Sequence, residues 1–431
     1  MRALSLVCLL SFSAGASLSG RYLSLPLGAR TCNAYASGAR GDGRSDDTAA
    51  LQRALALCGT AAGGTVLLPS NGTFLSFALT LPATAVGTAL QIEGTLRFSN
   101  ATQGWGKAPK ACLTLAGANI ALFGAGVVDG QGAAWWPCAK AGCARPNLLN
   151  AQVTSLLIKD LTFLDSPNHN LELYSSPLEV ANVTILAPPS TGVPNPSHNT
   201  DGLGACPQGA CASARMAPGS SPQALTAGTA APPLPPPPPP SPLDVHGSPA
   251  YIHSSHISTG DDHIAMHAND TLIEDCTFGT GHGASIGSLG AGTYLRNITV
   301  RSSSFKGATT ALRIKADNAS SGTLRGVVFR DLSMQGVGVT LALQSTYPAP
   351  SGPSGSTLAM SDIVFANITS AQAGAAGSLL CSALAPCTGL ALSDIVHTGS
   401  PPPLAWDCAN AQGTAQAPVT PPLGGCLGHG S

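Results

Sequence analysis

Residues 156–163 read Leu-Leu-Ile-Lys-Asp-Leu-Thr-Phe, a short apolar-rich segment interrupted by polar side chains. Similar segments recur toward the C-terminus, at residues 180–186, 252–257, 272–278, 295–300, 327–332 and 363–368. The more closely spaced segments start roughly 20–25 residues apart, which is typical of solenoids in which each repeat forms one coil. No repeat could bury its apolar face alone, so stacked coils would enclose a continuous apolar column. The pattern favours an all-β solenoid, with a β-sandwich as the alternative because short alternating strands also fit that class.

Only one segment has clear helical periodicity. In residues 46–57, Leu51, Leu55 and nearby alanines fall on one face of a helix. Asp46 and Asp47 stand at its start, where carboxylates are favourable. We expect a short N-terminal helix that covers the open end of the first coil, with these carboxylates as capping groups rather than catalysts.

Composition and charge exclude several classes of protein. Only 10% of the 431 residues are charged, against roughly 25% in ordinary soluble proteins, and there are 50 glycines and 35 prolines. This composition favours turns and strands in one elongated domain. The formal net charge of −1 offers no basic field for nucleic acid, so any attraction for an acidic partner must be local. We expect a monomer.

The N-terminus has the pattern of an export signal. Arg2 precedes an apolar stretch over residues 3–12 and the small residues Ala14-Gly15-Ala16, which predicts a signal peptide over residues 1–16. The stretch is too short to span a membrane stably, although an uncleaved anchor is the alternative. Sequons for N-glycosylation stand at Asn71, Asn100, Asn182, Asn269, Asn297, Asn318 and Asn367. We therefore expect a secreted glycoprotein of the extracellular space or cell wall, with no membrane association after signal cleavage.

The cysteine count agrees with export. Of 13 cysteines, Cys8 lies in the predicted signal, which leaves an even number suited to disulfides in an oxidising compartment. Pairs close enough in sequence to form local loops are Cys138 with Cys143, Cys206 with Cys211, Cys381 with Cys387, and Cys408 with Cys426, and Cys32 with Cys58 is a further pair. The sequence does not determine which cysteines pair. It contains no paired Cys-x-x-Cys spacing of the kind that binds zinc, so we expect neither metal nor cofactor.

We place one β-helix domain at residues 17–405, followed by a cysteine-containing tail at 406–431. Residues 206–243 form a proline-rich insertion that ends in six consecutive prolines. Proline lacks a backbone donor, so this run does not form an interior strand. We expect an outgrowth that leaves the flanking coils adjacent, because the entropy of loop closure rises only slowly with length.

Three aspartates stand in short polar runs within this aliphatic sequence. The runs are Ser197-His198-Asn199-Thr200-Asp201-Gly202 and Gly260-Asp261-Asp262. Carboxyl groups crowded together supply both an acid and a base, because mutual repulsion raises at least one pKa while others stay ionised. Such a pair is the usual machinery for hydrolysing glycosidic bonds. Both Asp261 and Asp262 can face one site only if the backbone bends at Gly260.

Two later runs, residues 281–290 (Gly-His-Gly-Ala-Ser-Ile-Gly-Ser-Leu-Gly) and 313–315 (Arg-Ile-Lys), complete a series of motifs in a fixed order. With all of them present, the chain resembles the polygalacturonase family of pectin-degrading glycoside hydrolases, from about residue 31 to about residue 347. The resemblance implies a single-stranded right-handed parallel β-helix. It also implies a secreted enzyme that hydrolyses α-1,4-galacturonosyl linkages in pectin with inversion.

The resemblance implies a role for each site residue. Asp261 would be the general acid, Asp201 and Asp262 the pair that activates water, and His282 a neighbour of the acid. Asn199 would orient Asp201 or contact sugar hydroxyls, and Tyr347 would contact substrate. His263 and His267 depart from the family, in which cysteine and lysine are frequent at these positions. Inversion predicts acid and base carboxyls about 6.5–9.5 Å apart.

Arg313 and Lys315 are separated by one residue, so on a strand they share a face while Ile314 points into the core. A guanidinium and an ammonium together suit the carboxylate of a uronate. This pair is the best evidence in the sequence for an acidic polysaccharide substrate such as galacturonan. Two alternatives stay open: a polysaccharide lyase and a noncatalytic protein that binds wall polysaccharide on the same fold.

Overall fold

The computed structural model describes Leu23 and residues 30–105, 110–137, 144–187, 197, 200–205, 249–347, 354–399 and 404–427. The predicted signal peptide, the whole proline-rich insertion, Asn199, and the cysteines at 138, 143, 206 and 211 lie outside the described residues. Among the described residues, no helix has the length and apolar character needed to cross a membrane.

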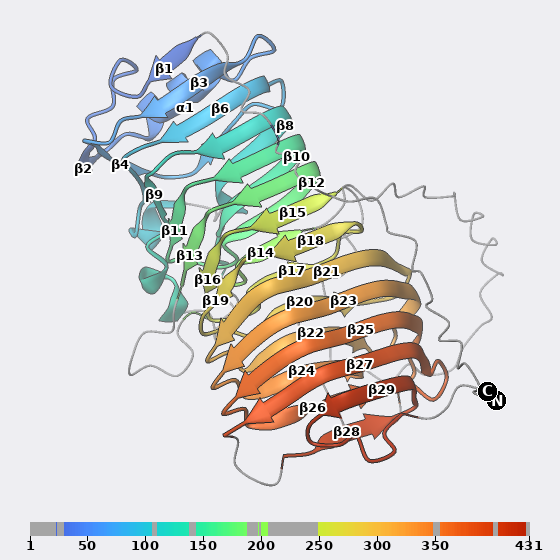
Figure 1. The fold of residues 1–431 in the computed structure, drawn as a ribbon. Helices are drawn as coiled ribbons and strands as arrows, with labels where there is room; N and C mark the ends of the chain where they lie inside the picture. Colours follow the sequence, from blue (N-terminus) through green and yellow to red (C-terminus); the bar gives the residue numbers. More distant parts are fainter. Residues whose placement is uncertain are drawn as a thin grey trace, which may run out of the picture.

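The strands stack in parallel as the coils of one solenoid, from the N-terminal coils in blue to the C-terminal coils in red (Figure 1). They form three ladders of successive pairings. Parallel pairing throughout excludes the β-sandwich and confirms the predicted right-handed parallel β-helix.

The first ladder, in stacking order, contains β5 (Leu79–Thr80), β8 (Ala111–Phe123), β10 (Asn147–Lys159), β12 (Leu171–Ala181), β14 (Leu203–Ala205), β17 (Ile264–Met266), β20 (Ala284–Leu289), β22 (Thr310–Asp317), β24 (Val339–Tyr347), β26 (Ala375–Leu380) and β28 (Trp406–Ala409). The second ladder begins with β1 (Thr31–Asn33), β3 (Gly64–Leu68) and β6 (Val86–Ile92), continues through the second halves of β8, β10 and β12, and ends with β15 (Ala250–His253), β18 (Thr271–Glu274), β21 (Thr293–Lys306), β23 (Ser321–Gln335), β25 (Thr357–Ala371), β27 (Cys387–Thr398) and β29 (Ala411–Val419). The third contains β2 (Asp42–Asp46), β4 (Thr73–Ser76), β7 (Thr95–Phe98), β9 (Val127–Asp129), β11 (Thr162–Leu164), β13 (Thr184–Leu186), β16 (His256–Ser258), β19 (Thr277–Phe278) and the last residues of β21, β23, β25 and β27.

Inward-facing side chains of successive coils stack into one apolar column. Among the largest fully buried side chains are Phe278, Phe305, Phe329 and Phe365. Phe278 stacks on Phe305 with ring centroids 4.6 Å apart, and Phe329 stacks on Phe365 at 5.3 Å. Each such burial stabilises the fold by roughly 1.5–3 kcal/mol, so the column holds the coils in register.

The corners between the second and third ladders use residues that tolerate a left-handed backbone. Asp160, Asn182, Asp331 and Asn367 all have φ between 50° and 62°. Asn182 donates a hydrogen bond to Asp160 (2.9 Å), and Asn367 donates one to Asp331 (2.9 Å), each across neighbouring coils. Asn and Asp are favoured in this conformation because their side chains can bond locally, and here they also link the coils.

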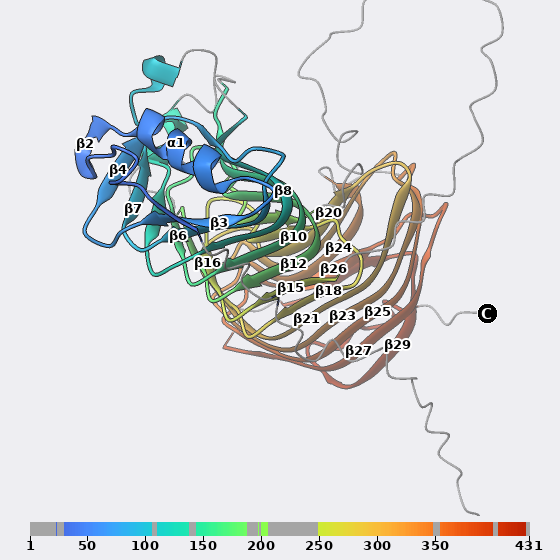
Figure 2. The same ribbon diagram turned by 90° about the horizontal axis from the view of Figure 1, so that it is seen from above.

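The predicted helix is α1 (Thr48–Cys58), which packs on β1, β3, β4 and β5 at the N-terminal end of the stack (Figure 2). Its buried face includes Leu51 and Leu55, as the periodicity predicts. The two preceding carboxylates have different partners. Asp46 accepts from the N–H of Thr48 (2.9 Å), whereas Asp47 accepts from the backbone of Arg40 (2.6 Å) and so holds the preceding turn rather than the helix. Two short 3-10 helices, η1 (Thr102–Trp105) and η2 (Gly132–Ala134), complete the elements.

The solenoid continues past the predicted boundary at residue 405, because β28 and β29 pair in parallel with β26 and β27. Three of the predicted disulfides form: Cys32–Cys58, Cys381–Cys387 and Cys408–Cys426. The even count does not mean that every cysteine is paired, since Cys112 and Cys276 are free and buried in the core.

Candidate active site

The three aspartates lie on turns that lead into neighbouring strands of the first ladder. Asp201 precedes β14, and Asp261 with Asp262 precedes β17. These strands pair directly, with Leu203 opposite Ile264, and the N–H of Gly202 donates to the carbonyl of Asp262 (2.8 Å). The coils on either side of the insertion are therefore adjacent, as predicted.

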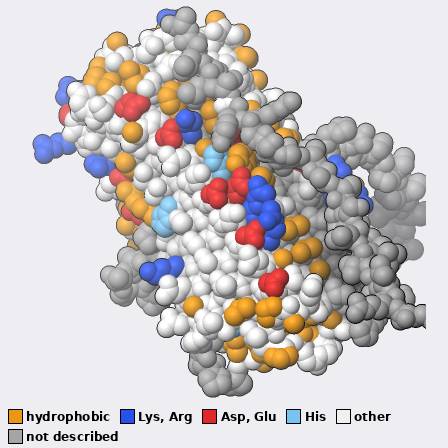
Figure 3. Space-filling model, viewed as in Figure 1, with side chains coloured by type: hydrophobic (Ala, Val, Ile, Leu, Met, Phe, Trp, Pro, Cys, Tyr) orange, Lys and Arg blue, Asp and Glu red, His pale blue; other side chains and the backbone are white. Residues whose placement is uncertain are grey.

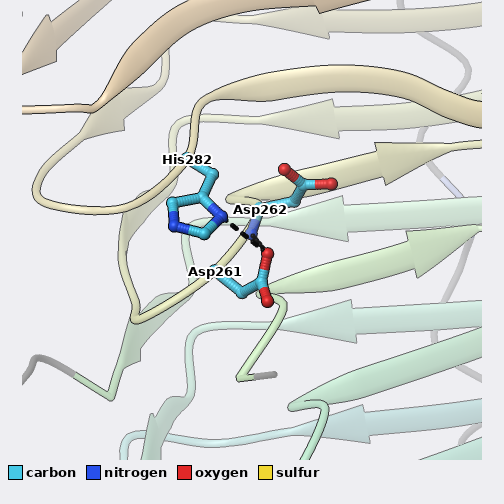
Figure 4. A group of neighbouring side chains, drawn as sticks. All are labelled: Asp261, Asp262 and His282. Carbon is cyan, nitrogen blue, oxygen red and sulfur yellow. Dashed lines mark hydrogen bonds and ion pairs between the residues drawn. The ribbon is translucent and has the colours of Figure 1, made fainter. Parts of the chain in front are cut away.

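The backbone bends between β16 and β17, which lets both Asp261 and Asp262 reach the site. A Cβ atom at Gly260 would lie 2.2 Å from the Ser197 hydroxyl and 2.3 Å from the Ser197 carbonyl, so only glycine fits. His282, on the next coil, lies with its Nδ1 2.8 Å from Asp261 Oδ1 (Figure 4). The amide of Asp262 donates to the same oxygen at 2.9 Å.

The turn of Asp201 is held by two fully buried polar side chains. Thr200 donates its hydroxyl proton to the carbonyl of Ser197 (2.7 Å) and accepts from the N–H of Gly260 (2.9 Å). The amide of Asn170 donates to the carbonyls of Thr200 (3.1 Å) and Asp201 (3.2 Å). Thr200 thus joins the two aspartate-bearing turns directly.

Asp262 is the centre of a buried charge cluster. Ser285 donates to its Oδ1 at 2.9 Å, Arg313 Nη1 lies 3.3 Å from the same oxygen, and Lys315 Nζ bonds Oδ2. Tyr347 lies beside both cations, with its ring centroid 5.5 Å from Arg313 and 5.3 Å from Lys315. Acidic and basic side chains gather near the middle of one face of the molecule (Figure 3).

The carboxyls of the site differ in proton affinity. Burial raises the pKa of Asp201 to about 6, with Asp261 and Asp262 adding repulsion, although the nearby His169 works to lower it. Burial also works to raise the pKa of Asp261, but the hydrogen bond from His282 and the positive charges of His282 and Lys315 outweigh it and hold the pKa at about 2. The same hydrogen bond raises the pKa of His282 above its ordinary value. A proton therefore resides on His282 beside Asp261, and a second on Asp201 below pH 6.

The two histidines that depart from the family pattern are neutral groups. Burial lowers the pKa of His263 to about 4, and burial together with the charge of Lys315 lowers that of His267 to about 4. His263 bonds the carbonyl of Thr280 (2.9 Å) and packs against Phe278. It therefore supports the bend beneath the aspartates.

Of the residues predicted from the sequence, the structure brings together Asp201, Asp261, Asp262, His282, Arg313, Lys315 and Tyr347. Asn199 lies outside the described residues. The sequence leaves two interpretations for Trp135 and Trp136, stacking on sugars or packing beneath a loop; both are buried, and Trp136 donates to the carbonyl of Ser166 (2.9 Å), so they pack.

Sequence reasoning missed His169, whose Nε2 lies 3.9 Å from Asp201 Oδ1, and it missed the partners Thr200, Asn170 and Ser285. Asn170 and His169 follow a predicted strand within the polar run 166–170, which was the available signal.

Asp261, Asp262 and His282 form a compact cluster. One oxygen each of Asp261 and Asp262 and one nitrogen of His282 lie within 4.8 Å of one another.

Comparison with known proteins shows extensive similarity. The sequence model described as glycosyl hydrolases family 28 matches residues 58–207 and 243–418. An endo-polygalacturonase of Pectobacterium carotovorum subsp. carotovorum is 27% identical over 410 residues, covering 86% of this chain and 88% of the relative. An exopolygalacturonase of Arabidopsis thaliana (clone GBGA483) is 27% identical, covering 90% and 81%.

Two solved structures share the fold. The endo-xylogalacturonan hydrolase of Aspergillus tubingensis superposes with a TM-score of 0.71 at 21% identity, covering 90% of this chain and 98% of that one. The hyperthermoactive exopolygalacturonase of Thermotoga maritima gives 0.68 at 18% identity, covering 90% and 91%.

Proposed function

Because the chain belongs to glycosyl hydrolase family 28, we propose that it is a polygalacturonase that hydrolyses α-1,4-galacturonosyl linkages in pectin. One observation carries the proposal: Asp201, Asp261 and Asp262 stand on adjacent turns, and a cationic pair contacts one of them. The relatives named as endo- and exopolygalacturonases support the substrate. Carboxyls in different protonation states beside cations suit cleavage between acidic sugars.

Asp261 with His282 acts as the general acid. Asp261 alone is too acidic to hold a proton near neutral pH, but the pair retains one on His282 at 2.8 Å. Groups coupled this tightly titrate as a unit. When negative charge develops on the leaving oxygen, the pair delivers its proton to that oxygen through Asp261, which leaves Asp261 as a carboxylate and His282 as a neutral imidazole.

Asp201 and Asp262 activate water. Both oxygens of Asp262 already accept hydrogen bonds from cations or a hydroxyl, so Asp262 is a poor nucleophile. Asp201, with a pKa of about 6, becomes a base of suitable strength just above that pH. A carboxylate held in this way orients water rather than attacking carbon, which supports inversion at the anomeric centre.

Arg313, Lys315, Tyr347 and Asn199 bind the substrate. Lys315 is the more deeply buried cation, with 7% of its side chain exposed against 14% for Arg313. Arg313 contacts Asp262 through Nη1, and the other donors of its guanidinium fork make it the better placed cation to meet a uronate carboxylate.

The test is a product assay on unesterified polygalacturonate with the wild type and Asp261→Asn. The wild type should release reducing ends with or without chelator, and proton NMR of the first products should show the inverted anomer. Asp261→Asn should lose at least about a thousandfold in kcat while keeping its fold, because the acid is removed. Asp394→Asn, the same change at an exposed corner of β27, is the matched control.

Full activity of Asp261→Asn would remove this residue from the mechanism. Binding of polygalacturonate without product from the wild type would favour a noncatalytic wall-binding protein. Unsaturated products that disappear with chelator would favour a lyase.

We further propose that the protein is a secreted monomer. The export pattern of residues 1–16 and the three disulfides support secretion, since disulfides persist in oxidising compartments. Asn269 is fully buried, so this sequon offers no glycosylation site in the folded chain. N-terminal sequencing of the exported protein should find it starting near residue 17, and an intact N-terminus would contradict cleavage.

A further inference from the structure

Glu172 places a negative charge on the surface that carries the site, on the side of the N-terminal coils. We propose that Glu172 makes this side a subsite for an uncharged sugar unit, so that the preferred substrate carries an uncharged unit there and a uronate at the cations. The inference rests on the proposed function and specifies its substrate.

Pairing in the first ladder places Glu172 in line with the residues around Asp262. Glu172 pairs with Gly204, Gly204 with Ala265, Ala265 with Ser285, and Ser285 with Arg313. Neighbouring strands are about 4.8 Å apart, so Glu172 lies about 10 Å along the stack from Ala265, on the coil of Asp262, and Arg313 lies about the same distance beyond it. A polysaccharide lying along this row would meet the carboxylate on one side of the aspartates and the guanidinium on the other.

The side chain of Glu172 faces outward and is held in place. Its neighbours in β12, Leu171 and Leu173, are buried, whereas Glu172 is half-buried. Buried Asn147 donates to Oε2 (2.6 Å), and Tyr174 donates to Oε1 (3.1 Å). These donors are neutral, and among the described residues no cation lies within ion-pair distance of Glu172.

A carboxylate without a cationic partner repels another carboxylate but accepts hydrogen bonds from sugar hydroxyls. A galacturonate at this position would bring two like charges together, whereas an esterified galacturonate or a neutral sugar would not. Specificity of this kind arises from repulsion of the wrong unit as well as attraction of the right one. The two ends of the row therefore differ in charge preference.

The experiment compares kcat/KM of the wild type and Glu172→Gln on three polymers: unesterified polygalacturonate, methyl-esterified galacturonan, and a polymer of alternating galacturonate and rhamnose. Glutamine keeps an acceptor for Asn147 and removes the charge. The variant should gain about five- to tenfold on unesterified polygalacturonate relative to the other polymers, and salt should shrink this gain by screening. If the wild type prefers methyl-esterified galacturonan, the uncharged unit beside Glu172 is an esterified galacturonate. If it prefers the polymer of alternating galacturonate and rhamnose, that unit is a neutral sugar.

Glu172→Asp keeps the charge and should keep the wild-type selectivity, as should Tyr174→Phe, which removes the hydroxyl that donates to Glu172 and leaves the charge. An unchanged ratio between polymers in Glu172→Gln, with an active wild type, overturns the inference and leaves the proposed function intact. If Glu172→Asp gains as much activity on unesterified polygalacturonate as Glu172→Gln does, the inference is also overturned, because the effect would then be steric. A wild type inactive on all three polymers overturns the proposed function itself.

Discussion

In the proposed mechanism, Asp201 is the carboxyl group whose ionisation sets the acidic limit of activity. Its pKa is about 6 because burial raises it, and the groups that face it are His169 on the preceding coil, Asp261 and Asp262 on the next, and Lys315 beyond. Activity should rise as the pH passes 6, when Asp201 ionises and can accept a proton from water. It should fall again at higher pH when the Asp261–His282 pair loses its proton, which occurs above the ordinary range of histidine because the pKa of His282 is raised.

Replacing His169 tests this assignment. A positive charge 3.9 Å from Asp201 lowers its pKa, so His169→Gln should raise that pKa and move the acidic limb of the kcat/KM profile upward by roughly half a pH unit. The basic limb should stay in place. His256→Gln, a change of an exposed histidine on β16 that bonds Thr277, is the control. If both limbs keep their positions in His169→Gln, Asp201 is not the group that limits activity at low pH.

The aspartates themselves could be predicted because they stand out as polar runs in an aliphatic sequence. His169 and Ser285 could not, because their proximity to Asp201 and Asp262 depends on which residues face each other across coils. The role of Lys315 was only partly predictable for the same reason. Because Ile314 stands between them, Lys315 and Arg313 are expected on one face of a strand. The buried contact of Lys315 with Asp262 follows instead from the pairing of β22 with β20 and of β20 with β17, the strand that Asp262 precedes.

The two aspartate-bearing turns behave as one element because Thr200 bonds both of them. Thr200→Val keeps the shape but removes the hydroxyl, which leaves the buried N–H of Gly260 without its acceptor. Such a loss costs about 1–3 kcal/mol of stability. It should also lower kcat more than it raises KM, since the spacing between Asp201 and the Asp261–Asp262 turn loosens while the cations that bind substrate are untouched. Steady-state kinetics and thermal unfolding measure both effects.

Thr200→Ser keeps the donor and the acceptor and should restore kcat to near the wild-type value. A valine variant with unchanged kcat and lower stability would show that Thr200 supports the fold without positioning the site. A serine variant as impaired as valine would point to the methyl group instead of the hydrogen bonds.

The coils were predictable where apolar alternation is strong, as in residues 156–163, which span the end of β10 and the start of β11. The last coil was missed because β29 is mostly exposed and lacks that alternation, having one buried residue, Ala411, at its start. The corners were also missed. Asp160 and Asp331 look like ordinary surface carboxylates in the sequence, and only the left-handed backbone reveals that they are turn residues.

The ends of a solenoid are its weakest coils, because each terminal coil has a neighbour on one side only. The described disulfides stand at these ends: Cys32–Cys58 beside α1, and Cys381–Cys387 and Cys408–Cys426 on the last coils. The aspartate-bearing turns lie between them, on coils with neighbours on both sides. Loss of a terminal disulfide should therefore loosen its own end before it disturbs the site.

The double substitution Cys408→Ser with Cys426→Ser opens a loop whose ends are 18 residues apart, and closing a loop of that length contributes about 3 kcal/mol. Hydrogen exchange should become faster in β27 to β29 and stay unchanged in β14, β17 and β20, with wild-type kcat at 25 °C. The matched pair Cys32→Ser with Cys58→Ser should instead increase exchange in α1, β1 and β3. Faster exchange along the whole stack, or loss of kcat at 25 °C, would show that the coils unfold as one cooperative unit, because a local change at either end would then reach the aspartates.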